Sequence, residues 1–260
     1  MSIPKIHVGI MNADKVEFNF QGEYQLVGTD HVLSGTGSVF IEKGNIQLAG
    51  TEVSKKTLFI VPLKSEKSEF ELKDVIIGVN FHWEQKENQK FQGALKFIIE
   101  ADKITAVNVL SIEDYLISVI SSEMSANCSL DLLKAHAIIS RSWLLAQIEK
   151  QDKLTDKGET YESTFETDEE YIKWYDREDH KNFHVCADDH CQRYQGITRS
   201  QNSNVVKAVS ETAGVVLSYR GEICDARFSK CCGGRSELFE NCWEPVNHPY
   251  LTAVIDNRVV

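Results

Sequence analysis

Hydrophobic and polar positions in the first hundred residues follow the two-residue period of β-strands. The clearest predicted strands are Phe18–Tyr24, Ser38–Glu42, Ala94–Ile99 and Ile104–Leu110. Their residues alternate in polarity or are rich in aromatic and β-branched types. Turn signals follow the second strand at Glu42–Asn45 and separate the last two strands at Ala101–Lys103. We therefore expect residues 1–110 to be β-rich.

The period changes to that of a helix at Ser111. Ser111–Asp114 resembles a capping box, a serine with an acidic residue three places later, and apolar residues follow at helical spacing. A second helix is expected from Ser129 to about Lys150. Its apolar stripe comprises Leu130, Leu133, Ala137, Leu144 and Ile148. The pattern predicts an α+β fold, in which the β-rich N-terminal part packs on this helical segment.

A polar, acidic stretch with interspersed aromatic residues runs from Gln151 to Asp179. It favours a surface excursion, and we expect residues 151–182 to form an inserted polar lobe within a core of residues 111–260. Strand-like residues return at Val215–Tyr219 and Ile223–Phe228, around a turn at Arg220. The chain contains no internal repeat and no low-complexity tract.

Composition and charge narrow the class of protein. The chain has 260 residues, of which 42% are hydrophobic, and its net charge is −11. This is ample for a hydrophobic core, while the acidic balance argues against nucleic acid as a partner, because phosphate binding needs a basic patch. No apolar run approaches the length of a membrane span. The start lacks the apolar region of a signal peptide, so we expect a cytoplasmic protein or one whose leader or anchor has been removed.

Glu123 is the first candidate for chemistry. If the helix after Ser111 continues, this carboxylate lies at the end of its apolar stripe, next to Val119 or Ile120. Desolvation at that position raises the pKa of a carboxyl group, which suits a general acid. The alternative is an ordinary surface glutamate at a frayed helix end.

Lys134 and Arg141 form a second candidate pair. They are seven residues apart on the second predicted helix and share a face beside its apolar stripe. Cations at the edge of a core either meet an anionic partner or ligand, or extend their heads into water. The sequence leaves both explanations open.

Cysteines and histidines concentrate between His180 and Cys191. The ligand types are those that a closed, structural zinc site uses, four nitrogen or sulfur atoms around the metal. A disulfide between Cys186 and Cys191 and surface histidines are the alternatives. We favour a metal, because chance clustering at this density is improbable.

The segment Ser229–Glu237 contains Cys231, Cys232 and two adjacent glycines. The glycines indicate close backbone approach or a positive φ angle. A cysteine nucleophile is conceivable here, although buried thiols packing as small apolar residues are the simpler explanation. No phosphate-binding loop, dinucleotide-binding motif or metalloprotease motif is present.

In three blocks, Ile112–Arg141, Val185–Gly196 and Ala208–Glu237, the chain resembles the stage II sporulation protein D (SpoIID)/LytB family. The resemblance covers about Ile104 to Leu251. It implies a peptidoglycan lytic transglycosylase, which cuts glycan strands between N-acetylmuramic acid and N-acetylglucosamine and prefers strands without stem peptides.

The resemblance also implies roles for individual residues. Glu123 matches the catalytic acid/base of the family. Lys134, Arg141 and Thr212 match positions that the family treats as functional, here expected to bind substrate. The family's zinc site, found in some members, matches His180, Cys186, His190 and Cys191, and His184 is the substitute if His180 points away.

Three departures from the family pattern concern substrate detail. His136 stands where the family usually has glutamine, Ser125 stands where it has proline, and Lys230-Cys231 replaces small polar residues. The family domain also normally continues beyond the point where this chain stops, so we expect its C-terminal end to be absent.

The resemblance leaves two classes of function open. The first is the transglycosylase, with peptidoglycan strands as substrate. The second is a binding module, because LytB-type members are described as enhancers of a separate cell-wall amidase. Either implies a location in the cell envelope, outside the cytoplasm. A hydrolase that uses Cys231 or Cys232 is a third, weaker reading.

Overall fold

The computed structural model describes residues 4–64, 68–79, 81–125, 127–157, 164–173, 180–198, 202–229 and 231–256. The chain divides into two compact units. The first comprises Met1–Lys134 and His180–Ala213, and the second comprises Ala135–Asp179 and Gly214–Val260. A large sheet with few helices confirms the predicted mixed α+β class. The division predicted at residue 110 stays a prediction.

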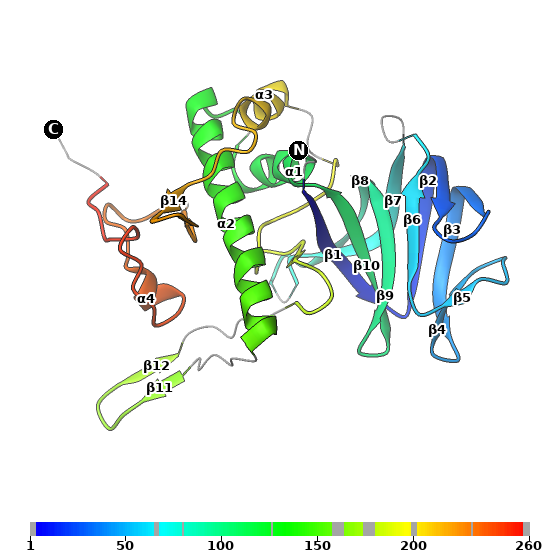
Figure 1. Ribbon diagram of the computed structural model, residues 1–260, viewed down its shortest axis with the longest axis horizontal. Helices are drawn as coiled ribbons and strands as arrows, with labels where there is room; N and C mark the ends of the chain where they lie inside the picture. Colours follow the sequence, from blue (N-terminus) through cyan, green and yellow to red (C-terminus); the bar gives the residue numbers. More distant parts are fainter. Residues whose placement is uncertain are drawn as a thin grey trace. The chain divides into compact units, whose positions relative to one another are not determined.

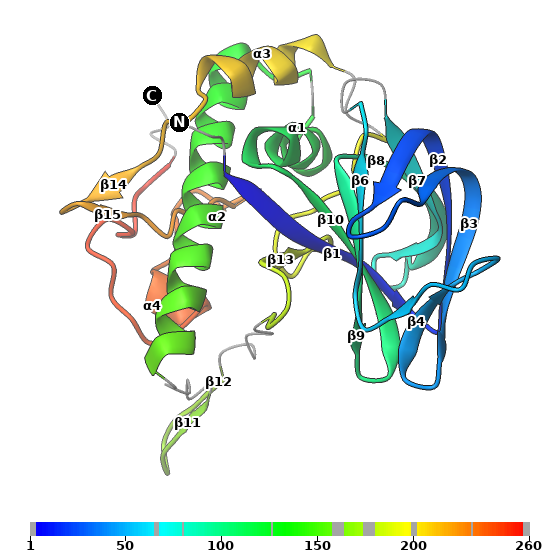
Figure 2. The same cartoon turned by 45° about the vertical axis from the view of Figure 1, so that its right-hand side comes forward.

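Among the described residues, an 11-stranded sheet makes up most of the first unit, together with two helices. Its strands are β1 (Lys5–Ala13), β2 (Lys15–Leu26), β3 (Val32–Glu42), β4 (Asn45–Leu48), β5 (Ser54–Lys55), β6 (Leu58–Pro62), β7 (Glu69–Ile77), β8 (Gln85–Gln92), β9 (Ala94–Glu100), β10 (Lys103–Ser111) and β13 (Val185–Cys186). The main path runs β13-β1-β10-β9-β6-β2-β3-β4-β5, and β7 pairs with β2 and with β8. Figures 1 and 2 show the long strands of this sheet in two views that differ by a 45° turn.

The four strands predicted between Phe18 and Leu110 all lie within observed strands. In β2 the side chains of Val16, Phe18 and Phe20 are buried and those between them are more exposed, as one buried face requires. By contrast, β10 is buried at every position from Ile104 to Leu110. It therefore lies in the core, covered on both faces.

Both predicted turns are confirmed. Ala101 and Asp102 join β9 to β10 with φ angles of 47° and 60°. Two consecutive positive φ angles are typical of the two-residue turns that match the twist of a hairpin. Lys43 and Gly44, with φ angles of 50° and 73°, make the same kind of connection between β3 and β4.

Helix α1 (Ile112–Glu123) follows β10 without a break. Its first turn is capped as predicted, because the Ser111 hydroxyl accepts a 3.1 Å hydrogen bond from the backbone N–H of Asp114. The apolar side of α1 is buried, and the helix contacts both β10 and α3 (Ser203–Glu211) (Figure 2). This packing places the C-terminal end of α1, and so Glu123, within the first unit.

Helix α2 (Leu130–Lys157) begins in the first unit and continues through the second. Leu133, Ala137 and Leu144 of its predicted stripe are fully buried. The helix runs beyond the expected end at Lys150, because neither glycine nor proline occurs before Gly158. No helix among the described residues combines the length and apolar character needed to cross a membrane.

The second unit contains two small hairpins and a short helix besides α2. These are β11 (Thr164–Glu166) with β12 (Tyr171–Lys173), β14 (Ser218–Tyr219) with β15 (Glu222–Ile223), and α4 (Phe239–Cys242). The strands expected at 215–219 and 223–228 are therefore only two residues each, around the predicted turn. The hairpin at 164–173 is exposed, and residues 158–163 and 174–179 of the predicted lobe lie outside the described residues.

Candidate functional site

Glu123 is the last residue of α1, and its side chain is half-buried. The apolar residues that precede it, including Val119 and Ile120, are fully buried, and the next residue, Met124, is extended. A carboxylate oxygen of Glu123 accepts a 2.8 Å hydrogen bond from the backbone N–H of Arg193. The carboxylate is therefore held at the end of an apolar stripe, as the sequence predicts.

The surroundings of Glu123 raise its pKa above the ordinary value for glutamate. Burial is the largest cause, because desolvation disfavours the charged form. The N–H of Arg193 and its positive charge oppose this shift, whereas the negative charge of Asp189 adds to it. A carboxyl group that keeps its proton to higher pH suits a general acid.

Segment 185–198 holds Arg193 in place against the sheet and α1. Its first residues form β13, and Tyr194, which is 2% exposed, donates a 2.6 Å hydrogen bond to the side chain of Asn108. The backbone N–H of Gln195 donates to the Ser118 hydroxyl at 3.1 Å. Because these bonds fix the residues on both sides of it, the Arg193 amide points at Glu123 with little freedom.

Asn108 links the segment 185–198 to the sheet through buried side-chain hydrogen bonds. Its side chain is fully buried in β10, and its amide group donates to the carbonyl oxygens of Gln92 and Ala94 at 2.8 and 3.1 Å. Its oxygen accepts the bond from Tyr194. Sequence reasoning missed this residue, since a single asparagine in an apolar strand was the only signal for it.

Four predicted metal ligands come together in the first unit. The ligand atoms of His180, Cys186, His190 and Cys191 all lie within 4.8 Å of one another. Cys191 Sγ lies 3.5 Å from His180 Nε2 and 3.5 Å from His190 Nδ1. Cys186 Sγ lies 3.9 Å from His190 Nδ1. The cluster could hold a metal ion.

These distances fit zinc. Bonds of about 2.3 Å to sulfur and about 2.0 Å to nitrogen at tetrahedral angles separate the two ligand types by about 3.5 Å. The neighbouring Cys191, His180 and His190 hold the pKa of the Cys186 thiol well below its usual value, although burial opposes this. A thiolate is the form that binds a metal. All the described cysteines are free thiols, so no Cys186–Cys191 disulfide is formed here.

His184, the predicted substitute ligand, faces away from the cluster. Its Nδ1 accepts a hydrogen bond from the backbone N–H of His7 at 3.2 Å, and the two imidazoles stack with centroids 5.1 Å apart. His180 is thus the histidine that completes the four-ligand group.

Lys134 and Thr212 also belong to the first unit. Lys134 Nζ lies 2.6 Å from one carboxylate oxygen of Glu211, and the other oxygen lies 3.9 Å from Lys207 Nζ. Thr212 caps the C-terminus of α3, and its buried hydroxyl donates to the carbonyl oxygens of Ala208 and Val209. Lys134 therefore has an anionic partner, and the proton of the Thr212 hydroxyl is used within its own helix.

Arg141 lies in the second unit and is 1% exposed. Its Nη1 donates to the carbonyl oxygen of Val215 at 3.0 Å and more weakly to that of Ala137 at 3.5 Å. The alternative in which the Arg141 guanidinium group extends into water is therefore wrong. Because Arg141 and Glu123 belong to different units, a groove shared by them stays a prediction.

His136 is also buried in the second unit, at 2% exposure. Burial lowers its pKa to about 4, so the ring is neutral at pH 7. Its ring meets Phe228 edge to face at 4.6 Å, and neither nitrogen has a hydrogen-bond partner among the described residues. The family glutamine at this position is thus replaced by an uncharged aromatic ring.

The thiol of Cys232 donates to an Asp256 carboxylate oxygen at 3.4 Å. Activated cysteine nucleophiles are instead paired with a histidine or another cationic group. Cys231 is exposed, and Lys230 lies outside the described residues. The geometry therefore gives no support to a cysteine nucleophile.

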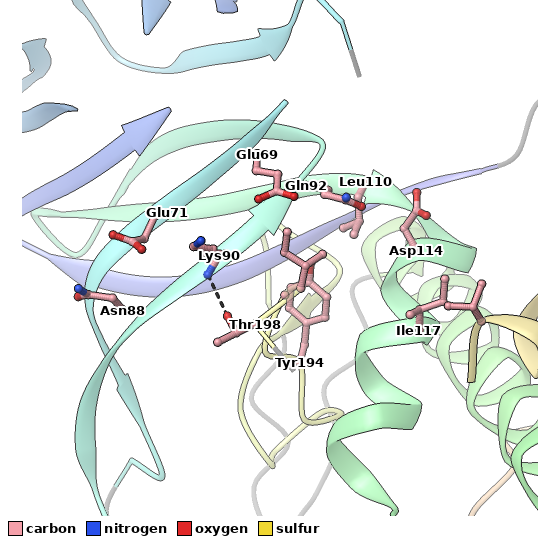
Figure 3. Close-up of a pocket in the computed structure, with 13 residues that line it drawn as sticks. Glu69, Glu71, Asn88, Lys90, Gln92, Leu110, Asp114, Ile117, Tyr194 and Thr198 are labelled. Atoms are coloured by element: carbon pink, nitrogen blue, oxygen red, sulfur yellow. Dashed lines mark hydrogen bonds between the residues drawn. The ribbon is translucent and has the colours of Figure 1, made fainter. Parts of the chain in front are cut away.

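The first unit also contains a cavity of about 460 Å³, which both charged and apolar residues line. Figure 3 shows Glu69 and Glu71 of β7, Lys90 of β8, and Asp114 and Ile117 of α1 around it. Glu123 does not line this cavity. From Asp114 to Glu123 is two and a half turns at about 3.6 residues per turn, so the two carboxylates lie on opposite faces of α1.

The part of the chain that contains the candidate site matches a known protein family. Residues 100–219 match the family described as SpoIID, stage II sporulation protein. The matched segment contains all of α1, the four clustered ligands and Thr212 at the end of α3.

Two curated relatives match part of the chain. An uncharacterised protein of Brachyspira hyodysenteriae is 30% identical over 166 residues, which are 64% of this chain and 37% of that protein. A Bacillus subtilis protein named amidase enhancer is 31% identical over 140 residues, 54% of this chain and 15% of that protein. The chain thus spans well under half the length of either relative.

Proposed function

This chain belongs to the SpoIID/LytB family through residues 100–219, and from this premise we propose that it is a peptidoglycan lytic transglycosylase. It cleaves the glycan backbone between N-acetylmuramic acid and N-acetylglucosamine, preferring strands without stem peptides. The observation that carries the proposal is Glu123, a half-buried carboxyl group with a raised pKa, fixed by the Arg193 amide.

One carboxyl group is sufficient for this reaction. Glu123 donates its proton to the oxygen of the glycosidic bond as that bond breaks. The 6-hydroxyl of the same muramic acid residue attacks the anomeric carbon and yields a 1,6-anhydro product. The proton of this hydroxyl returns to Glu123, so no water is consumed. A hydrolytic glycosidase would instead need a second carboxylate.

The Arg193 N–H serves the second half of this cycle. A hydrogen bond from a backbone amide stabilises a carboxylate more than a carboxylic acid. After Glu123 has given up its proton, this bond holds the carboxylate in the orientation in which it can accept a proton from the sugar. The same amide thus supports the acid and base roles of one residue.

Zinc at His180, Cys186, His190 and Cys191 is structural in this proposal. Four protein ligands leave no open position for substrate or water. The ion, when bound, cross-links a loop and supplies no chemistry to the reaction. Since Arg193 follows Cys191 by two residues, the cluster supports the hydrogen bond to Glu123.

Lys134, Arg141 and Thr212 are assigned to substrate binding. Muramic acid without a stem peptide carries a free carboxylate, which the ammonium group of Lys134 can attract. The β-sheet and α1 form one wall of the glycan site. The substrate implies a location in the cell envelope, outside the cytoplasm, and the acidic chain argues against nucleic acid as a partner.

A second candidate function is a non-catalytic enhancer that binds glycan and assists a cell-wall amidase. The name of the Bacillus subtilis relative favours it. The two functions differ in their products. Incubating the purified protein with glycan strands freed of peptide, followed by mass spectrometry, tests for 1,6-anhydro products. Products with the wild type and none with Glu123→Gln support the enzyme, whereas intact strands with both proteins support the enhancer.

A further inference from the structure

A smaller cavity of about 80 Å³ lies in the first unit beside the loop that carries Arg193. It is lined by residues of β1, β7 and β8 and by residues 186–188 and 193–195. Ile10, Val75 and Ile77 make part of its lining apolar, and Gln89 and Gln195 add carboxamide groups. A water molecule occupies about 30 Å³ in the liquid, so the cavity has room for a group larger than one water.

Both glutamines have an unsatisfied polar atom. Gln89 is 1% exposed and Gln195 is 3% exposed, and neither Gln89 Nε2 nor Gln195 Oε1 has a hydrogen-bond partner among the described residues. One atom is a donor and the other is an acceptor. Buried polar groups are rarely left unpaired, because desolvation without a bond costs free energy. The pair therefore indicates a ligand group that both accepts and donates.

An aromatic surface borders this cavity. Trp83 lines it, and its ring lies so close to Gly78 that a Cβ atom there would meet the indole at 2.3 Å. Phe81 stacks on Trp83 with centroids 5.7 Å apart and is 51% exposed. The Arg193 guanidinium lies 5.1 Å from the Trp83 ring centroid. Flat, partly exposed rings of this kind provide an apolar face against which a sugar ring can stack.

We infer that this cavity binds the acetamido group of an N-acetylated sugar of the glycan strand. The carbonyl oxygen of the acetamido group accepts from Gln89 Nε2, its N–H donates to Gln195 Oε1, and its methyl group packs on the apolar lining. The sugar ring lies on the Trp83 side. This inference rests on the proposed function, because it takes a glycan strand as the ligand.

Arg193 connects this subsite to the candidate acid. Its side chain lines the cavity and lies over Trp83, while its backbone N–H donates to Glu123. Gln195, which holds the acetamido group in this arrangement, is two residues from Arg193, whose backbone N–H orients Glu123. The subsite therefore selects N-acetylated sugars without a charged recognition group.

Binding without turnover tests the subsite. In the full chain carrying Glu123→Gln, calorimetry compares peptide-free glycan strands with the same strands after de-N-acetylation. We expect the acetylated strands to bind about tenfold more tightly, because de-N-acetylation removes the carbonyl that accepts from Gln89 Nε2 and the methyl group, and it leaves a charged amine in a partly apolar cavity. Gln89→Met and Gln195→Met keep side-chain length but remove the polar atoms, and both should lower this ratio. The effect should be larger for Gln89→Met, because the carbonyl that this amide binds exists only in the acetylated strands.

Two controls protect the interpretation. Gln92→Met, on the same strand β8 but outside this cavity, should keep the ratio. The free amines of the de-N-acetylated strands add charge, and the part of its effect that arises outside this cavity is common to all variants and cancels when their ratios are compared. Thermal unfolding checks that each variant is folded, and the two independent Met variants guard against failure of either one.

The outcomes separate the subsite from the proposed function. An unchanged ratio in both folded Met variants would mean that the cavity holds only water or that the glutamines pair with each other, and would overturn the subsite. If the variants lose the preference for acetylated strands and the wild type releases no anhydro product, the subsite is supported and the transglycosylase activity is overturned. Since the strands carry no peptide, a stem-peptide amide cannot account for binding.

Discussion

The backbone N–H of Arg193 donates a 2.8 Å hydrogen bond to the carboxylate of Glu123, seventy residues earlier in the chain. Arg193 follows Cys191, one of the four clustered ligands, by two residues. The orientation of the candidate acid therefore depends on a loop that is held at one end by the ligand cluster and at the other by Tyr194. A defect in either anchor should act on Glu123 at a distance.

Glu123→Gln should abolish cleavage of peptide-free glycan. The amide keeps an oxygen that can accept the bond from Arg193 but has no proton to donate, so turnover should fall by about 10² to 10⁴-fold. Release of 1,6-anhydro products measures this, and the thermal unfolding temperature should not fall. Glu52→Gln, at an exposed position, is the matched control. Wild-type turnover in Glu123→Gln would exclude this residue as the acid.

The pH dependence of turnover should report the raised pKa of Glu123. The protonated form is the active acid, so turnover should decline as pH rises through the folded-state pKa. Asp189→Asn removes a negative charge that raises this pKa, and the midpoint of the decline should move to lower pH. Asp168→Asn, exposed and in the other unit, should leave the midpoint in place.

The same pKa shift has a consequence for stability. A carboxyl group whose pKa is higher in the folded state binds more protons there than in the unfolded chain. Its contribution favours folding below the unfolded-state pKa and is lost as pH rises through the folded-state pKa. Glu123→Gln should therefore be at least as stable as the wild type at neutral pH. A clearly lower unfolding temperature for the variant at pH 7 would contradict the direction of the shift.

Protein purified without added metal should contain about one zinc ion per chain, as a closed four-ligand site implies. Cys186→Ser and Cys191→Ser should each lower the zinc content measured by elemental analysis, together with the unfolding temperature. Cys242→Ser, an exposed thiol outside the cluster, and His184→Ala, whose ring faces His7, should retain zinc.

Acid should release the metal, because thiolates and neutral imidazoles bind it and their protonated forms do not. Negligible zinc in the wild type, with Cys186 and Cys191 titrating as free thiols or forming a disulfide, would remove the metal site. The assignment of Glu123 would be unaffected by that result.

Asn108→Leu should destabilise the protein by about 3 to 5 kcal/mol, because it leaves the Tyr194 hydroxyl and the carbonyl oxygens of Gln92 and Ala94 without their partner. Tyr194→Phe removes one of these bonds and should cost about 1 to 2 kcal/mol. Urea unfolding measures both. Equal losses for the two variants would mean that the carbonyl bonds of Asn108 contribute little.

Lys134→Gln should weaken binding of peptide-free glycan and change the unfolding temperature little. The ammonium group is partly exposed, and its ion pair with Glu211 is at the surface, where screening by water and salt makes such pairs weak. Added salt should weaken glycan binding by the wild type more than binding by the variant, because salt screens the charge of Lys134. An unaltered affinity in Lys134→Gln would remove this residue from substrate binding.

Local signals in the sequence determined the secondary structure around the site. The capping serine before α1, the two-residue turns at 101–102 and 43–44, and the apolar stripe of α2 all follow from neighbouring residues, and the structure confirms them. The grouping of the four metal ligands was also predictable, because they lie within twelve residues of one another. Where local signals were weak, at the end of α2 and in the strands after residue 215, the predictions were wrong in length.

Only the tertiary structure decided what surrounds Glu123 and which polar groups are left unpaired. The amide of Arg193, the bond from Tyr194 to Asn108, and the cavity between Gln89 and Gln195 join residues some seventy to over one hundred positions apart. No periodicity or spacing encodes such contacts, because they arise when packing of the apolar faces brings distant segments together. The sequence singled out Glu123 as the candidate acid, and the fold supplied the desolvation and the hydrogen bond that adjust its pKa.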